Sequence, residues 1–162
     1  MITLRSALLL FTCFCSTALF ADEIFVITHQ QSSITKLTPK LIENIFLKKT
    51  LLNDVGNTWI PLNLDPNHPI RIAFSLALFK KKPEELEVFW NEQYFQGITP
   101  PYVVASEDAM LRFVSTTQNA IGYALPCHIT DQVHVIFKVN SPLSLKQFCS
   151  ISASDRMLRL WV

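Results

Sequence analysis

The chain has 162 residues, of which 49% are hydrophobic, and a formal net charge of +1 at pH 7. This charge lacks the basic excess on which nucleic-acid binding depends, so we expect no nucleic-acid partner. The hydrophobic content is that of a globular protein and excludes a disordered chain.

The first 21 residues predict a secretory signal peptide, which leaves residues 22–162 as a single domain. Arg5 precedes the apolar run "ALLLFTCFCSTALFA", which has the length of a signal h-region and is too short to span a bilayer. Cleavage is expected after Ala18 or Ala21. We therefore expect an exported, periplasmic protein without a transmembrane helix in its mature part.

Four cysteines divide between the signal and the domain. In an alternative lipoprotein form, Cys13 or Cys15 would be acylated. Cys127 and Cys149 are expected to form a disulfide in an oxidising compartment, worth roughly 3 kcal/mol in the chain-entropy model. Two buried free thiols are the alternative, and no neighbouring base suggests a cysteine nucleophile.

Within the domain, strands and helices are predicted to alternate in chain order. Thr38 and Pro39 start the first helix as N-cap and first helical residue, and Ser106 caps the last one. The segment 154–162 fits either a helix or a strand. The predicted strands are 23–29, 58–64, 102–106, 120–125 and 133–139, and the predicted helices are 38–49, 70–82, 83–97 and 106–114.

Individual residues refine this pattern. Gly56 predicts a turn, and Pro61 predicts that the strand 58–64 lies at an edge of the sheet or contains a bulge. Asn119 is suited to a left-handed turn, and Gly122 marks a close backbone approach within the next strand. The alternation predicts a three-layer α/β/α domain around a mixed sheet.

No catalytic or metal-binding constellation is recognisable in the sequence. The four histidines have no second ligand at helical metal spacing, and Glu84 with Glu85 fits the start of a helix better than acid–base catalysis. No nucleotide-binding or nucleophile motif is present. We expect neither an enzyme, nor a metal, nor a cofactor.

The stretch "LNLDPNHPIRIAF" offers the best candidate binding site. A polar loop runs directly into a helix start, so backbone N–H groups near Asn67 and His68 are expected to point outward towards an anion. Arg71 in the first turn can offer a bidentate fork to an oxyanion. Alternatively, Arg71 simply pairs with Asp65 or with the C-terminal face of another element.

Ligands of such folds bind in crevices at the ends of strands, and three loops are candidates to line one: 29–35, 63–71 and 115–120. The candidate ligand-binding residues are Arg71, Asn67, His68, Asn63, Ser32 and Ser33.

Several motifs occur together in order: "ITKLTPKLIENIFLKK", then "WIPLNLD" with Arg71 and Phe74, then "FWNEQYFQGITPPYVVASEDAMLRFVSTTQNAIGYAL". This set resembles the short exported members of the phosphate-type periplasmic substrate-binding-like family, which have the type II binding-protein fold. The resemblance covers roughly residues 24–139.

The resemblance implies a domain like one lobe of a phosphate-binding clamshell, serving an ABC-type transporter or a sensor. The family's Ser-, Gly- and Thr-containing phosphate loop is replaced here by Asp65–Pro69, whose two prolines remove amide donors. A solute-binding domain for phosphate or another small anion is the first hypothesis. The alternative is an envelope interaction or signalling module that has lost ligand binding.

Overall fold

The computed structural model describes residues 22–34 and 36–149, and the predicted signal peptide and the segment 154–162 lie outside them. The strands are β1 (Glu23–His29), β2 (Ile60–Asn63), β3 (Tyr102–Val103), β4 (Ala120–Ala124) and β5 (Val133–Asn140). The helices are α1 (Pro39–Phe46), α2 (Pro69–Phe79), α3 (Glu87–Phe95) and α4 (Glu107–Thr116), with short 3₁₀ turns η1 (Pro83–Leu86) and η2 (Pro126–His128).

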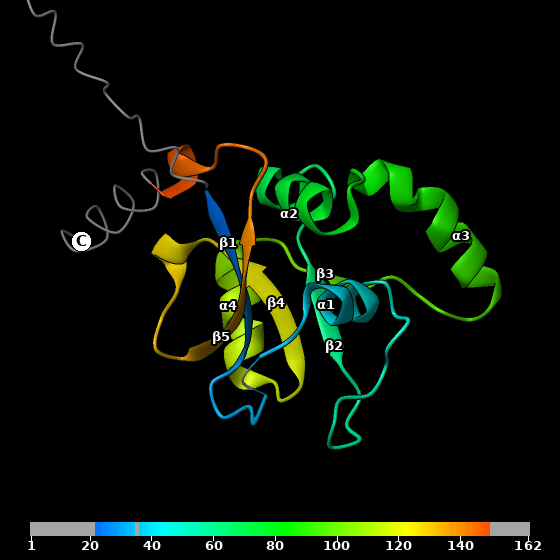
Figure 1. Ribbon diagram of the computed structural model, residues 1–162, viewed down its shortest axis with the longest axis horizontal. Helices are drawn as coiled ribbons and strands as arrows, with labels where there is room; N and C mark the ends of the chain where they lie inside the picture. Colours follow the sequence, from blue (N-terminus) through cyan, green and yellow to red (C-terminus); the bar gives the residue numbers. More distant parts are fainter. Residues whose placement is uncertain (1–21, 35, 150–162) are drawn as a thin grey trace, which may run out of the picture.

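The strands form one mixed sheet in the order β3-β2-β4-β1-β5 (Figure 1). β2 runs parallel to both β3 and β4, whereas β1 runs antiparallel to β4 and β5. The carboxyl end of β1 therefore lies at the end of the sheet where β2 and β4 begin. This direction decides which loops can meet in a site.

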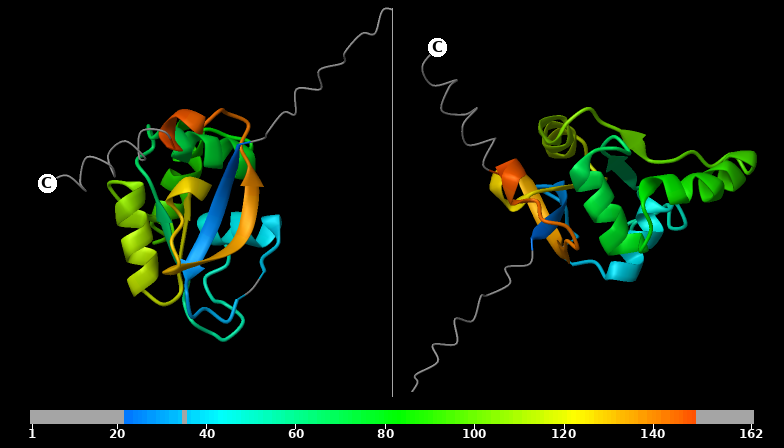
Figure 2. Two further views of the ribbon diagram at one scale, coloured as in Figure 1. Left: turned by 90° about the vertical axis from the view of Figure 1, so that its left-hand side faces the viewer. Right: turned by 90° about the horizontal axis from the view of Figure 1, so that it is seen from above.

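Helices cover both faces of the sheet, which confirms the three-layer prediction (Figure 2). α4 packs on β4 and β1 from one side, while α1 and α2 contact the sheet from the other. Gly122 allows β4 and α4 to lie close together: a Cβ at this position would lie 2.4 Å from Met110 Sδ and 3.2 Å from Val114 Cγ2. The expected close approach at Gly122 is thus one between strand and helix.

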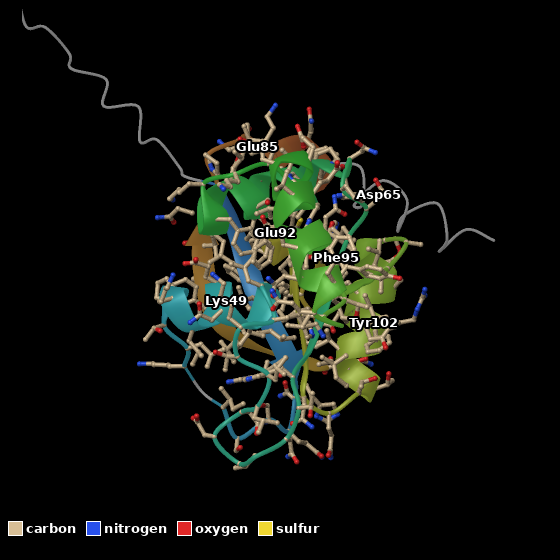
Figure 3. All side chains as sticks on the ribbon, turned by 90° about the vertical axis from the view of Figure 1, so that its right-hand side faces the viewer. Lys49, Asp65, Glu85, Glu92, Phe95 and Tyr102 are labelled. Carbon is tan, nitrogen blue, oxygen red and sulfur yellow. A yellow bond between two sulfur atoms is a disulfide. The ribbon has the colours of Figure 1, made fainter. Side chains whose placement is uncertain are left out.

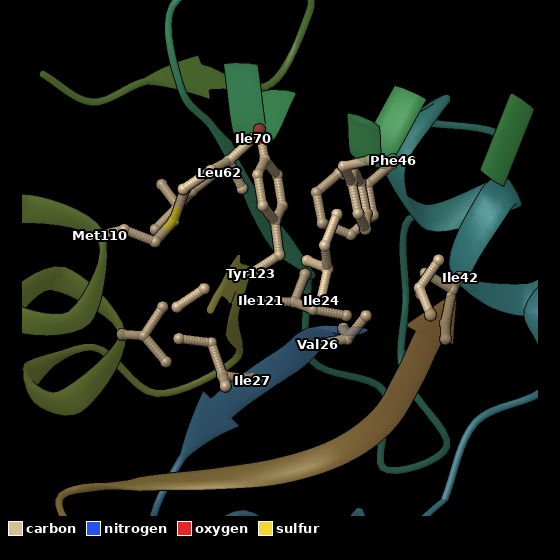
Figure 4. Packing of buried hydrophobic residues seen from close by; sticks show 14 of the residues in the cluster. Ile24, Val26, Ile27, Ile42, Phe46, Leu62, Ile70, Met110, Ile121 and Tyr123 are labelled. Carbon is tan, nitrogen blue, oxygen red and sulfur yellow. The ribbon is translucent and has the colours of Figure 1, made fainter. Parts of the chain in front are cut away.

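On the opposite face of β4, aromatic rings fill the space under α1 and α2 (Figure 4). Tyr123 stacks on Phe74 with ring centroids 4.0 Å apart, and Phe46 packs against both rings at 6.0 and 5.0 Å. All three side chains are at most 1% exposed. Consecutive residues of β4 thus serve different layers, as the pleat of a strand requires.

The expectation for Pro61 was wrong, because β2 is neither an edge strand nor bulged. Pro61 pairs with Ile121 of β4 and is buried. The second neighbour, β3, pairs only with Leu62 and Asn63. Proline is tolerated in this inner strand because β3 is too short to need its missing N–H.

Two of the predicted helix starts are confirmed by their caps, whereas the helix predicted from Pro83 begins as the 3₁₀ turn η1 and is α-helical only from Glu87. The Thr38 side chain accepts the Leu41 N–H, and Ser106 accepts that of Ala109. Asn119 has a φ of 62°, the left-handed turn expected of it. A cap that the sequence analysis missed is His68, whose Nδ1 accepts the Ile70 N–H at 3.3 Å and starts α2.

Cys127 and Cys149 form the expected disulfide, with their Cα atoms 5.7 Å apart. It ties η2 to the segment that follows β5. Across residues 22–34 and 36–149, no helix combines the length and apolar character needed to cross a membrane.

Candidate functional site

Arg71 lies in the first turn of α2 and is only 7% exposed. Its Nη1 donates a hydrogen bond to the side-chain oxygen of Asn63, the last residue of β2. Asn63 is itself 4% exposed. The loop between β2 and α2 folds these two polar groups against each other, so two of the predicted site residues do meet.

The charge of Arg71 has no carboxylate within ion-pair distance among the described residues. The alternative partner Asp65 is exposed, and its Oδ1 instead accepts the Asn67 N–H at 2.8 Å. Arg71 Nε is buried and has no hydrogen-bond partner within the described part of the chain. Burial lowers the pKa of the guanidinium because the charged form loses hydration.

Tyr123 brings a hydroxyl close to this arginine. In Figure 4 its side chain points from β4 towards Ile70 in the first turn of α2. The Leu64 N–H donates to the hydroxyl oxygen at 3.0 Å. Burial raises the pKa of Tyr123 to about 12, opposed in part by the Arg71 charge. The hydroxyl is therefore protonated at neutral pH and can donate a hydrogen bond.

Tyr123 was not predicted as a site residue, although the stretch "AIGYA" contained a signal for it. Gly122 marked one face of that strand as packed tightly, and strand alternation sends the next side chain to the opposite face. Ser75, one turn after Arg71, was also missed: its hydroxyl is fully buried and unpartnered within the described residues. Residues four apart lie on one face of a helix.

The expected free amides of the 65–70 loop are not available. The Asn67 and His68 N–H groups donate to the Asp65 side chain and carbonyl, at 2.8 and 2.9 Å. The Ile70 N–H is held by His68. This Asx turn followed by a histidine cap uses these three donors internally, so they are not available to an anion.

Ser32 and Ser33 are not part of this constellation. They follow β1, whose carboxyl end lies at the opposite end of the sheet from Asn63 because β1 is antiparallel to β4. Ser32 Oγ accepts the Ile34 N–H within its own loop. The loops 29–35 and 115–120 instead line a separate shallow hollow, which is formed by His29, Gln30, Gln31, Ser115, Thr116 and Gln132.

A second polar pair, between the partly buried Glu107 and His128, links two elements of the fold and leaves His128 Nε2 buried without a hydrogen-bond partner among the described residues. Glu107 Oε2 and His128 Nδ1 lie 2.7 Å apart, and Glu107 Oε1 accepts the Leu125 N–H at 2.7 Å. The pair ties the start of α4 to the chain after β4. Within the described residues, no group of three or more His, Cys, Asp or Glu side chains is placed to hold a metal ion.

The fold is that of phosphate-transport binding proteins. A substrate-binding protein assigned to phosphate ABC transport, with bound phosphate, from Clostridium perfringens is similar at a TM-score of 0.57 and 23% identity over 71% of this chain. A phosphate transport receptor from Vibrio cholerae is similar at a TM-score of 0.60 and 13% identity over 82% of the chain. PstS from Borrelia burgdorferi is similar at 0.57 and 19% over 78%.

The matched region spans 44%, 62% and 50% of those three proteins, about half of their length. The expected resemblance to one lobe of such a protein is thereby confirmed at the level of fold. No protein-family model matches the sequence, and neither does any curated protein.

Proposed function

We propose that the protein is a non-catalytic solute-binding domain that holds a small oxyanion at Arg71, with phosphate as the first candidate. In this proposal it works in the periplasm with an ABC-type transporter or a sensor. The similar solved structures support the solute-binding part. The anion-binding part rests on the buried Arg71 guanidinium, which has no carboxylate partner among the described residues.

Burying an unpaired charge is unfavourable unless a counter-charge or good hydrogen bonds compensate for it. Asn63 supplies one neutral oxygen only. The first turn of α2 adds the positive end of a helix dipole and contains no acidic residue. Arg71 and the helix dipole both favour an anion here, and the Glu107 carboxylate, which also raises the pKa of Tyr123, is the negative group that opposes them.

The available donors favour an oxyanion. Arg71 presents a planar fork with an unused Nε, Tyr123 presents a protonated hydroxyl, and Ser75 a further hydroxyl. Oxygens carrying negative charge accept from all three groups. Because the loop amides are already used, we expect affinity to depend on these side chains more than on the backbone.

A thermal-shift series on the purified mature protein tests this proposal. Sodium phosphate and sodium sulfate are compared with sodium chloride at matched ionic strength. At a hundredfold excess over its dissociation constant, a bound anion stabilises by about 2.7 kcal/mol, roughly 8 °C at this chain length. Arg71→Met should abolish the shift, and Arg112→Met, at an exposed arginine of α4, should preserve it.

Two outcomes contradict the proposal. One is a wild-type melting temperature that no oxyanion raises above the chloride control. The other is an oxyanion shift that persists in Arg71→Met, which would place binding elsewhere. A folded Arg71→Met protein, checked by circular dichroism, is required for either comparison.

The location is tested separately, because the proposed signal peptide lies outside the described residues. The intact mass of protein recovered from the periplasmic fraction should match cleavage after Ala18 or Ala21. The mass of the uncleaved chain would contradict the predicted signal cleavage. A mass increased by acyl chains at Cys13 or Cys15 would show the lipoprotein form instead.

A further inference from the structure

α3 stands away from the rest of the molecule (Figure 1). None of its nine residues is buried, although it lies wholly within the described part of the chain. Phe95 is 90% exposed, and Val88 and Tyr94 are 69% and 67% exposed. A helix that folds for stability alone buries an apolar stripe, so this arrangement calls for another explanation.

The apolar exposure continues into β3, which the chain reaches after α3. Tyr102 and Val103 are 67% and 59% exposed. β3 is the edge of the sheet, with β2 on one side only. Figure 3 shows Phe95 and Tyr102 on the same side of the molecule, together with Glu85 and Glu92. We call this surface the α3 face; its residues are Glu87, Val88, Glu92, Tyr94, Phe95 and Tyr102.

The α3 face carries an excess of acidic side chains. Glu84, Glu85, Glu87 and Glu92 of η1 and α3 are exposed. The cations beside them are Lys82, whose Nζ is 3.7 Å from the Glu84 carboxylate, and Lys49, whose Nζ lies 5.6 Å from the centroid of the Phe89 ring. The whole chain is almost neutral, so its charge is segregated. Glu87 and Glu92 are exposed and have no ion-pair partner within the described residues.

A hollow of about 380 Å³ lies at the base of α3. Glu84 and Glu87 line it together with Lys82, whose ammonium is 3.7 Å from the Glu84 carboxylate. It has room for the end of a further cationic side chain, which Glu87 would then neutralise. The remaining lining residues are Pro66, Asn67 and Ile72.

We propose that the α3 face binds a basic, apolar segment of another protein. Aromatic side chains are the usual anchors of such interfaces, and Phe95, Tyr94 and Tyr102 provide them without rearrangement. The glutamates select Lys- or Arg-rich partners and accelerate their approach. The six residues of the α3 face do not include Arg71 or Asn63, although the hollow at the base of α3 is also lined by Asn67 of the loop between β2 and α2. The inference does not require an anion at Arg71.

The glutamates of the α3 face argue against a membrane, a nucleic acid or a second copy of this chain as its partner. An anionic membrane surface and nucleic acid both repel a carboxylate cluster. A second copy related by two-fold symmetry would place the acidic face against itself, since such interfaces use the same patch on both subunits. A basic protein segment is the occupant that matches both the apolar and the charged parts.

Fluorescence anisotropy with a labelled synthetic peptide of alternating Lys/Arg and Leu/Trp residues tests the proposal on the mature protein. Phe95→Ser and the double variant Glu87→Gln/Glu92→Gln should each weaken binding about tenfold or more. Control variants are Leu143→Ser and Asp131→Asn, which change one exposed apolar and one exposed acidic residue elsewhere. All substituted side chains are exposed, so the fold should be preserved.

Comparator probes give the results that would overturn the proposal. A peptide with Glu in place of Lys and Arg should not bind, and one with Ser in place of Leu and Trp should bind at least about tenfold more weakly. Absence of binding, equal binding by the Ser peptide, or unchanged affinity in Phe95→Ser contradicts it. So does binding to phosphatidylglycerol vesicles, or a wild-type dimer in sedimentation that Phe95→Ser dissociates.

Discussion

If Arg71 is kept for an anion, removing its charge should make the anion-free protein more stable. The informative variant is Arg71→Met combined with Asn63→Leu. It replaces the donor and its acceptor by apolar side chains of similar length, so that neither buried group loses its partner. We expect this double variant to fold and to resist denaturation better than wild type in buffers free of oxyanions.

The magnitude follows from the hydrogen bonds. Arg71→Met alone removes the unpartnered Nε, a gain of about 1–3 kcal/mol, but leaves the Asn63 oxygen unpartnered, a loss of about the same size. The single variant should therefore be close to wild type. Adding Asn63→Leu removes that loss, so the double variant should gain about 1–3 kcal/mol, as is found when buried charged groups are replaced by apolar ones.

Urea unfolding followed by tryptophan fluorescence measures this difference, with Trp59 as a buried reporter. The series contains wild type, both single variants and the double variant, each with and without phosphate. Phosphate should stabilise only the proteins that retain Arg71, namely wild type and Asn63→Leu. A double variant less stable than wild type by more than about 2 kcal/mol without anion would refute the reasoning, because the arginine would then be a net stabilising group.

Three further outcomes are expected. Gly122→Ala should lose about 1–3 kcal/mol of stability, because its methyl group meets Met110 Sδ, and a Met110→Ala background should reduce that loss in a double-mutant cycle of urea unfolding; equal losses in both backgrounds would contradict the contact. The raised pKa of Tyr123 means that stability is full below pH 10 and falls by about 2–3 kcal/mol as pH rises from 10 to 12, because the folded state keeps a proton that the unfolded state releases; Tyr123→Phe should flatten this part of the profile. Reduction of the Cys127–Cys149 disulfide should lower the free energy of unfolding by about 3 kcal/mol. The bond itself is checked by intact mass, because the native protein should be lighter than the reduced protein by the mass of the two thiol hydrogens.

Local signals explain why most elements were predictable. Thr38 and Ser106 mark helix starts through their own hydroxyl groups, and Asn119 marks a turn through its tolerance of positive φ. Each of these properties acts within a few residues of the chain. The disulfide was predictable because Cys127 and Cys149 are the only two cysteines that follow the predicted signal peptide.

Long-range pairing explains what could not be predicted. The position of Ser32 relative to Asn63 depends on the direction of β1 against β4, which no local pattern encodes. Pro61 was misjudged for a related reason, since its tolerance depends on how far β3 extends along β2. The isolation of Arg71 is also a global property: Asp65 is near in sequence, yet its carboxylate is already engaged with the Asn67 amide.

The two proposed surfaces should differ in their response to salt, and this difference separates them. Arg71 is only 7% exposed, so ions in solution screen its charge poorly. The glutamates of the α3 face are exposed, so their attraction should weaken strongly between low and physiological salt. Phosphate affinity that is nearly independent of sodium chloride, beside peptide affinity that falls steeply with it, would assign the two activities to separate places on one lobe. A common salt dependence would instead indicate that both probes use the exposed surface, and would remove the case for a buried anion site.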